Sequence, residues 1–310
     1  MSGEEIDVVT VGHVLVDIRL LVDRFPKPDE EARILEEKHG VGGSAANVAI
    51  AIRRLGLKSA IIAKIGLDGF GRIAVDELLK EQVDISGLKI SPTLPTGFSV
   101  VARDSEGRIV IYGFKGASEK LKPEDIEEKL VEKTRFIHIS SLRPDTSVYV
   151  AKLAKKLGKK VSWDPGRRLA SLGIAKLETL IKHVDIVFAN KREALLLTGM
   201  EDYRKVAQAI RKLGPKIVII KKGSEGAYMQ CGNMEIDMPA YTPPKVVDTT
   251  GAGDAFAGGF LTALIRNYDL SKALKYASIV AALKVSKLGS HTTPTSQEII
   301  EYTRRYGLEI

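Results

Sequence analysis

The segment Asp-Thr-Thr-Gly-Ala-Gly-Asp, residues 248–254, has residue types and a spacing suited to phosphoryl transfer. Because Gly251 and Gly253 lack side chains, the N–H groups of residues 251–254 can point together at an anion, reinforced by the positive end of a following helix. Asp254 would stand in the first helical turn, where a carboxylate can accept the proton of a hydroxyl that attacks phosphorus. We therefore predict an anion hole with Asp254 as the catalytic base.

A purely structural interpretation of this segment also exists. Asp248 or Thr250 could cap a helix, and the glycines could serve close packing of the backbone. A Thr-Gly-x-Gly-Asp pattern alone leaves both interpretations open.

Residues 40–47 form another glycine-rich stretch, the first of the two in chain order, which leads into an apolar-periodic helix expected at 48–55. The pair Gly42 and Gly43 would let a substrate approach the backbone, and Asn47 could both donate and accept hydrogen bonds to a diol. The stretch also matches part of the dinucleotide fingerprint, which needs a hydrophobic strand immediately before it. The preceding residues are polar, which disfavours that alternative, and no Gly-x4-Gly-Lys-Ser/Thr loop occurs in the chain.

The elements that must position these residues alternate between strands and helices. An apolar run over residues 6–12 predicts a buried first strand. We expect strand-then-helix pairs at 59–65 and 71–80, 136–139 and 146–157, 160–163 and 169–181, and 186–188 and 191–198. Repeated units of this kind predict an α/β fold with a mainly parallel sheet covered by helices on both faces. Ligands bind such open sheets at the carboxyl ends of the strands.

Two stretches break this alternation and predict a small β-sheet lid over that site. Residues 14–22 alternate weakly between apolar and polar types, and residues 97–114 read as a hairpin. We expect a large α/β domain over 1–12, 38–90 and 117–310, with a lid over 13–37 and 91–116 inserted in it. Because an uncovered sheet edge invites pairing, a homodimer through the lid strands is one expected form of the protein.

The composition limits the classes of protein to which the chain can belong. Of the 310 residues, 44% are apolar and 28% are charged, which is typical of a packed globular protein. The net charge of +8 makes nucleic acid a partner to consider, but basic residues are interleaved with acidic ones, so we expect no nucleic-acid binding. An acidic N-terminus without a long apolar run predicts a cytoplasmic protein that does not contact a membrane.

Two further compositional features bear on chemistry and habitat. Because Cys231 is the only cysteine, an intrachain disulfide or a cysteine-rich zinc site is excluded. Few Asn and Gln residues beside abundant Lys and Glu indicate a thermophile protein.

The glycine-rich stretches together resemble the signatures of the ribokinase family, also called PfkB-type carbohydrate kinases. Residues 248–254 are similar to its C-terminal signature and residues 40–47 to its N-terminal Gly-Gly signature, and further matches run in family order from Gly12 to Gly289. The resemblance implies a ribokinase-like fold and an ATP- and Mg2+-dependent kinase that phosphorylates a hydroxyl of a sugar or a nucleoside. ADP as the phosphoryl donor stays open.

The resemblance also assigns roles to individual residues. Substrate contacts fall on Asp17, Gly42, Gly43 and Asn47, and the anion hole on Gly251, Ala252 and Gly253 beside the base Asp254. Nucleotide contacts fall on Asn190, Lys222, Gly223, Gly226, Thr249, Ala281 and Gly289. Glu193 would organise Mg2+ through water, and Asp248 with Thr250 would hold a monovalent cation such as K+. Asn190 and Glu193 would also make a good capping box, so that both roles can hold together.

Four basic residues near the expected sugar end leave the acceptor open: Lys115, Arg143, Arg167 and Arg168. A forked guanidinium after a strand could bind a carboxylate or a phosphate of the acceptor, whereas exposed arginines without a ligand are the alternative. The sequence around these residues is more similar to that of archaeal nucleoside and ribose-type kinases than to that of phosphofructokinases. We therefore favour a ribose-type sugar or a nucleoside over a sugar phosphate or a 2-keto-3-deoxy sugar acid. The rival of a different class is a binding protein of this fold without turnover, which would not need Asp254.

Overall fold

The computed structural model describes residues 5–310. Residues 1–4, which belong to the acidic N-terminus on which the cytoplasmic prediction partly depends, lie outside the described part, as does the start of the predicted large domain. Among the helices of residues 5–310, none combines the length and the apolar character needed to cross a bilayer.

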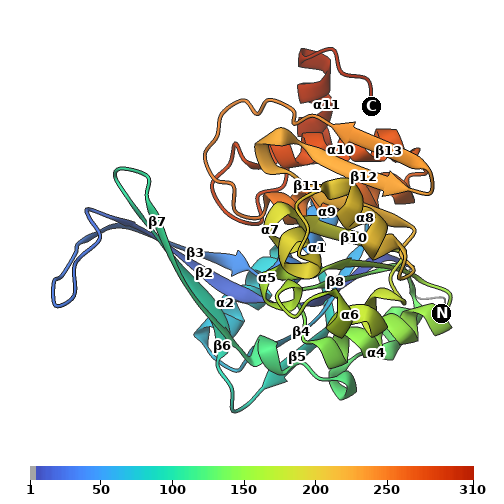
Figure 1. Cartoon of the computed structure of the whole chain (residues 1–310). Helices are drawn as coiled ribbons and strands as arrows, with labels where there is room; N and C mark the ends of the chain where they lie inside the picture. Colours follow the sequence, from blue (N-terminus) through green and yellow to red (C-terminus); the bar gives the residue numbers. More distant parts are fainter. Residues whose placement is uncertain (1–4) are drawn as a thin grey trace.

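A central sheet of the described chain runs in the order β13-β12-β11-β10-β9-β8-β1-β4-β5 (Figure 1). Its strands are β1 (Ile6–Gly12), β4 (Ser59–Gly66), β5 (Asp84–Ser91), β8 (Thr134–Ser140), β9 (Lys160–Asp164), β10 (Ile186–Asn190), β11 (Ile217–Lys221), β12 (Ala227–Cys231) and β13 (Met234–Met238). All neighbours from β5 to β11 pair in parallel, whereas β12 and β13 add an antiparallel hairpin at one edge. This confirms the predicted mainly parallel sheet.

Helices cover both faces of this sheet. They are α1 (Ser44–Arg54), α2 (Gly69–Lys80), α3 (Glu128–Glu132), α4 (Pro144–Lys156), α5 (Gly166–Ala170), α6 (Ile174–Ile181), α7 (Lys191–Thr198), α8 (Tyr203–Arg211), α9 (Ala252–Ile265), α10 (Leu270–Lys284) and α11 (Ser296–Arg305). Short 3-10 turns occur at Ala117–Lys120, Pro123–Asp125 and Gly223–Glu225.

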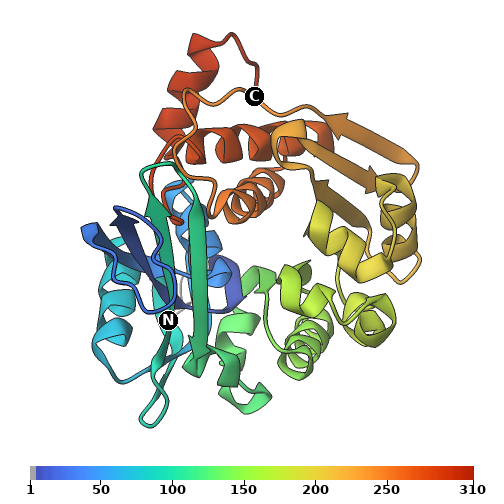
Figure 2. The same cartoon turned by 60° about the vertical axis from the view of Figure 1, so that its left-hand side comes forward.

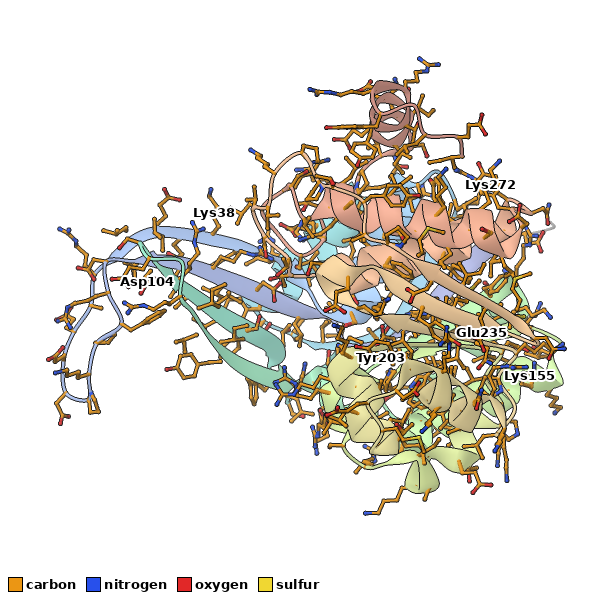
Figure 3. The ribbon with its side chains drawn as sticks, turned by 45° about the horizontal axis from the view of Figure 1, so that its top comes forward. Lys38, Asp104, Lys155, Tyr203, Glu235 and Lys272 are labelled. Carbon is orange, nitrogen blue, oxygen red and sulfur yellow. The ribbon has the colours of Figure 1, made fainter. Side chains whose placement is uncertain are left out.

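Continuous apolar strands supply a core to each of the two helical layers. In β1, Val9 and Val11 pack into the core under α3 to α8, whereas Val8 packs into the core under α1 and α9 to α11. Lys155 on α4 and Lys272 on α10 consequently lie on opposite sides of the sheet (Figure 3). Burial on both faces explains why these strands read as unbroken apolar runs in the sequence.

A separate small sheet projects from the body, as the predicted fold requires (Figures 1 and 2). Its order is β3-β2-β6-β7, with β2 (Leu15–Val22), β3 (Ile34–Gly42), β6 (Thr96–Asp104) and β7 (Ile109–Gly116). Lys38 in the middle of β3 and Asp104 at the end of β6 lie in the part of this sheet that extends away from the large sheet (Figure 3). The hairpin predicted near residue 105 is present, since β6 pairs with β7 in antiparallel fashion.

Two local predictions differ from the structure. The helix expected at 169–181 is interrupted, because Gly173 adopts a φ of 79° and separates α5 from α6. The polar residues before the first glycine-rich stretch do form a strand, β3, but this strand is an edge of the small sheet and pairs antiparallel to β2. Exposure on that edge accounts for its polar sequence, and the stretch is therefore not part of a dinucleotide-binding βαβ unit.

Candidate active site

The second glycine-rich segment becomes the N-terminus of α9, as the sequence predicts. Gly251 is the residue before the helix and has a φ of 77°, which favours glycine. A side chain at this position would also collide with the carbonyl of Ser290. Because Gly253 and Asp254 lie in the first helical turn, their N–H groups have no intrahelical acceptor and are free to bind an anion.

Asp254 is joined to the first glycine-rich stretch by a hydrogen bond. Nδ2 of Asn47, on α1, donates to Oδ2 of Asp254 at 2.7 Å. Burial raises the pKa of the Asp254 carboxyl to about 6, although the bond from Asn47 works in the opposite direction. A carboxyl with this pKa is an effective proton acceptor near neutral pH.

A lysine that the sequence analysis did not select stands at the centre of this site. Lys221, the last residue of β11, places Nζ 2.5 Å from Oδ2 of Asp164 at the end of β9. Although burial opposes its charge, Asp164 and Glu193 hold the pKa of Lys221 above its ordinary value. A Cβ atom on Gly253 would lie 3.1 Å from the same Nζ, so the ammonium borders the anion hole. The signal that could have revealed Lys221 is its position directly after a buried apolar strand, at the ligand-binding edge of the sheet.

A cavity of about 540 Å3 lies beside the anion hole. Its lining includes Lys221, Gly223, Ser224, Gly226, Ala240, Tyr241, Thr242, Pro243, Val246, Thr249, Ala252, Gly253, Phe256, Ser278, Ala281, Ala282 and Val285. The structure thus brings together four of the residues predicted to contact nucleotide, namely Gly223, Gly226, Thr249 and Ala281. An apolar wall that ends at backbone N–H groups and an ammonium suits a base at one end and phosphates at the other.

Three other residues predicted to contact nucleotide do not line this cavity. The ammonium of Lys222 pairs with Asp237 on β13. Asn190 caps α7, and Gly289 donates its N–H to Oδ2 of Asp248 at 3.0 Å.

Asn190 and Glu193 form the predicted capping box at the start of α7. Oδ1 of Asn190 accepts the N–H of Glu193 at 2.9 Å, and Oε2 of Glu193 accepts the N–H of Asn190 at 2.8 Å. Burial, followed by the charge of Asp164, raises the pKa of Glu193 above its usual range. Buried acids that resist ionisation beside a single ammonium would favour a divalent cation in their vicinity.

These acids suit Mg2+ held through water rather than by direct ligation. Within residues 5–310, no group of three or more His, Cys, Asp and Glu side chains is arranged to hold a metal ion directly. Mg2+ keeps several of its waters and the oxygens of a nucleotide as ligands, so Glu193 and Asp164 are the residues that would orient it.

The loop with Asp248 and Thr250 is held by donors that face its oxygen atoms. Oδ1 of Asp248 accepts the N–H of Thr250 at 2.9 Å, Oδ2 accepts the N–H of Gly289, and the carbonyl oxygen accepts Nζ of Lys284 at 2.8 Å. Burial works against ionisation of Asp248, but these two N–H groups keep its pKa below the usual range. A potassium ion at this position would need oxygens directed at it, and the ammonium of Lys284 already occupies one of them.

Asp17 faces the first glycine-rich stretch from strand β2 of the small sheet. Its carboxylate accepts hydrogen bonds from Ser99 at 2.5 Å, Ser290 at 2.7 Å and Arg19 at 3.0 Å. A side chain on Gly42 would collide with this carboxylate. Gly43, with a φ of 93°, has no room for a side chain beside the carbonyl of His13. The four residues predicted to contact substrate are therefore placed around the junction of β3 and α1.

The basic residues predicted at the sugar end do not all converge. Arg168 donates to Glu119 at 2.8 Å, and Lys115 is half-buried and interacts with the same carboxylate. Burial, together with the charges of Lys115 and Arg168, lowers the pKa of His13 to about 3. Two cations therefore share one carboxylate beside a neutral histidine, which leaves a positive potential there.

The other two arginines differ from each other in exposure and in partners. Arg143 bonds Asp145 at 2.6 Å at the start of α4, and Arg167 is exposed to solvent. Of the four basic residues predicted near the acceptor, Lys115 and Arg168 both interact with Glu119, and the charge of Arg143 also interacts with this carboxylate.

The chain matches the sequence pattern of the pfkB family carbohydrate kinase over residues 5–297. It is 34% identical over 295 residues to an ATP-dependent ribose-1-phosphate kinase of Halopiger xanaduensis, an alignment that covers 95% of this chain and 97% of the relative.

Solved structures show the same fold. The Arabidopsis thaliana ribokinase complexed with ribose and ATP superposes with a TM-score of 0.86 at 28% identity, covering 96% of this chain and 98% of the other. A protein of E. coli assigned as ribokinase II, in complex with ATP and Mg2+, gives a TM-score of 0.85 at 27% identity and covers 97% of this chain and 99% of the other.

Proposed function

This chain belongs to the pfkB family of carbohydrate kinases, and we propose that it moves the γ-phosphoryl group of ATP to a hydroxyl of a ribose-type sugar with Asp254 as the base. Members of this family transfer a phosphoryl group from ATP to a sugar or a nucleoside. The observation that carries the assignment of roles is the hydrogen bond between Asn47 and Asp254, directly beside the N-terminus of α9.

The proposed reaction begins with the acceptor hydroxyl close to Asp254. The carboxylate takes the hydroxyl proton while the oxygen forms its bond to the γ-phosphorus, and the bond from that phosphorus to the bridging oxygen of ADP breaks. The N–H groups of Gly253 and Asp254, with the ammonium of Lys221, stabilise the charge on the transferred group. Their positions are set before the reaction by α9 and β11.

Mg2+ would neutralise the phosphate oxygens of the nucleotide when bound. Glu193 and Asp164 would hold it through its waters. Lys221 and Asp164 both lie at the carboxyl edge of the sheet. Lys221 can therefore stay paired with Asp164 and still face the anion hole.

At the acceptor end, we assign sugar hydroxyl contacts to Asp17 and Asn47. Asn47 uses Nδ2 for Asp254 and keeps a buried Oδ1 without a hydrogen-bond partner in the described chain, which is an acceptor suited to a hydroxyl. The carboxylate of Asp17 is fixed by three donors and would accept from further hydroxyls.

A ribosyl phosphate is a second candidate acceptor, and the pair Lys115 and Arg168 favours it. Both cations interact with Glu119, so an entering phosphate would compete for a site that already has excess positive charge. The relative from Halopiger xanaduensis bears a name that specifies a phosphorylated ribose.

One experiment separates these acceptors. Ribose, ribose 1-phosphate, ribose 5-phosphate, cytidine, adenosine and 2-keto-3-deoxygluconate would each be offered with ATP, and again with ADP. With a ribosyl phosphate, Arg168→Gln should raise KM at least about tenfold and leave kcat nearly unchanged. With a neutral ribose or nucleoside, the same variant should behave as wild type, and Arg167→Gln serves as the matched control in both cases.

We also propose that the small sheet pairs two copies of the chain. The edge strand β7 exposes Ile109, Ile111, Tyr112 and Phe114. An exposed apolar edge is a common site of strand pairing. Light scattering on the wild type and on Ile111→Lys tests this proposal, because a charge on the edge should convert the dimer to a monomer.

A further inference from the structure

Lys284 is a buried lysine whose charged end faces the loop of the anion hole. It is the last residue of α10 and is fully buried. Nζ donates to the carbonyl oxygen of Asp248 at 2.8 Å. Residues on either side of it, Ala282 and Val285, line the nucleotide cavity, but Lys284 itself does not.

The loop that Lys284 bonds is connected rigidly to the catalytic groups. The backbone N–H groups of Val247 and Asp248 both donate to the carbonyl of Val285, at 2.8 and 3.1 Å. The carboxylate of Asp248 accepts one N–H from within its own loop and one from Gly289. Only three residues further along, Gly251 starts the turn into α9, so the position of Asp248 determines where the anion hole stands.

The oxygen atoms of Asp248 accept from three donors, namely the N–H groups of Thr250 and Gly289 and the ammonium of Lys284. A free monovalent cation at this position would need the same carbonyl and carboxylate oxygens as ligands. The ammonium of Lys284 reaches one of those oxygens and is covalently attached to the chain, so its effective concentration at the site is high. The site therefore needs no cation from solution. Its position at the C-terminus of α10 is also favourable for a cation.

We propose that the ammonium of Lys284 is a tethered monovalent cation that fixes the loop of Asp248 and thereby makes the anion hole independent of added potassium. Lys284 is a positioning residue, since it acts on the transferred phosphoryl group through residues 248–254. The inference rests on the proposed role of that segment as the anion hole.

The first test uses the wild-type protein. Melting temperature and turnover are measured in tetramethylammonium chloride, KCl and NH4Cl at equal ionic strength. We expect turnover to agree within about twofold across the three salts, because the site has its own cation. A saturable activation by K+ of about fivefold or more would overturn the proposal.

The second test removes the ammonium. Lys284→Ala should lose about 10- to 100-fold in kcat in tetramethylammonium, because a displaced loop misplaces the anion hole. NH4+ and K+ should then restore activity in a saturable manner and raise the melting temperature of this variant, since either ion can enter the vacated space. Lys284→Met should show the loss without the rescue, because its side chain fills that space without a charge.

A control and a readout without turnover keep the outcomes distinct. Lys155→Ala removes a lysine that pairs with Asp185 at 2.9 Å on α4, and its properties should not depend on the cation. The cation-dependent rise in melting temperature needs no acceptor, so it can succeed even where the assigned reaction fails. A folded Lys284→Ala protein that neither K+ nor NH4+ stabilises or reactivates would contradict the proposal. If this variant does not fold, the wild-type salt series and Lys284→Met decide.

Discussion

Asn47 donates a hydrogen bond from Nδ2 to Oδ2 of Asp254 at 2.7 Å, and so connects the starts of two helices that are 207 residues apart in sequence. Asn47 lies on α1, directly behind the small sheet, whereas Asp254 lies in the first turn of α9. The proposed substrate contact and the proposed base are therefore one unit. If the acceptor displaced α1, the hydrogen bond from Asn47 to the carboxylate of Asp254 would change as well.

The acid limb of the pH profile should report this hydrogen bond. The pKa of Asp254 is raised to about 6 in the free protein, and the base works only as a carboxylate, so kcat/KM should fall as the pH falls through about 6. Because the bond from Asn47 lowers this pKa, Asn47→Ala should move the acid limb to higher pH. The measurement is kcat/KM for the acceptor against pH. If the acid limb of Asn47→Ala stays at the same pH as in wild type, the group that titrates there is not Asp254.

Lys221 should matter far more than its neighbour Lys222. Lys221→Met removes the ammonium beside Gly253 and leaves Asp164, Glu193 and Asp254 without a counter-charge, so kcat should fall about 100- to 1,000-fold. Lys222→Met removes only a pair with Asp237 near the surface and should change kcat less than about threefold. Steady-state kinetics with ATP compares the two variants. Equal losses in both would mean that Lys221 has no special role at the phosphates.

Gly251 should not tolerate a side chain. Gly251→Ala combines a φ of 77° with a collision against the carbonyl of Ser290, so it should lower the free energy of unfolding by about 1–3 kcal/mol and displace the anion hole. Gly69→Ala is the control, because no atom lies within 4 Å of the added Cβ and the residue starts α2. Thermal unfolding and turnover test both variants, and a fully active Gly251→Ala protein would show that the turn is not essential.

The parallel sheet and its helices could be predicted from the sequence because their signals are local. Unbroken apolar runs, as in β1 and β10, mark strands that are buried on both faces. The interrupted helix at 169–181 was missed, since a single Gly173 inside an apolar-periodic segment is tolerated in many helices. Strand β3 was missed because an exposed edge strand carries no apolar pattern.

The candidate site could be predicted in part. The glycine-rich segments can be recognised in the sequence, because few other residues can adopt their backbone geometry. Lys284 has no such signal in the sequence, and for Lys221 and Asp164 the signal is only their position directly after an apolar run. Only the three-dimensional arrangement shows that Lys115 and Arg168 share Glu119 whereas Arg167 is exposed.

The central claim is that Asp254 is the base that takes the proton of the acceptor hydroxyl. The most direct measurement compares Asp254→Asn with wild type in two assays, turnover with ATP and an accepted sugar, and binding of ATP by calorimetry. Asn has nearly the same shape and keeps the N–H of the anion hole, but it cannot accept the proton. We predict that kcat falls about 100- to 10,000-fold whereas the Kd for ATP changes less than about threefold. Turnover close to that of wild type in Asp254→Asn would contradict the assignment.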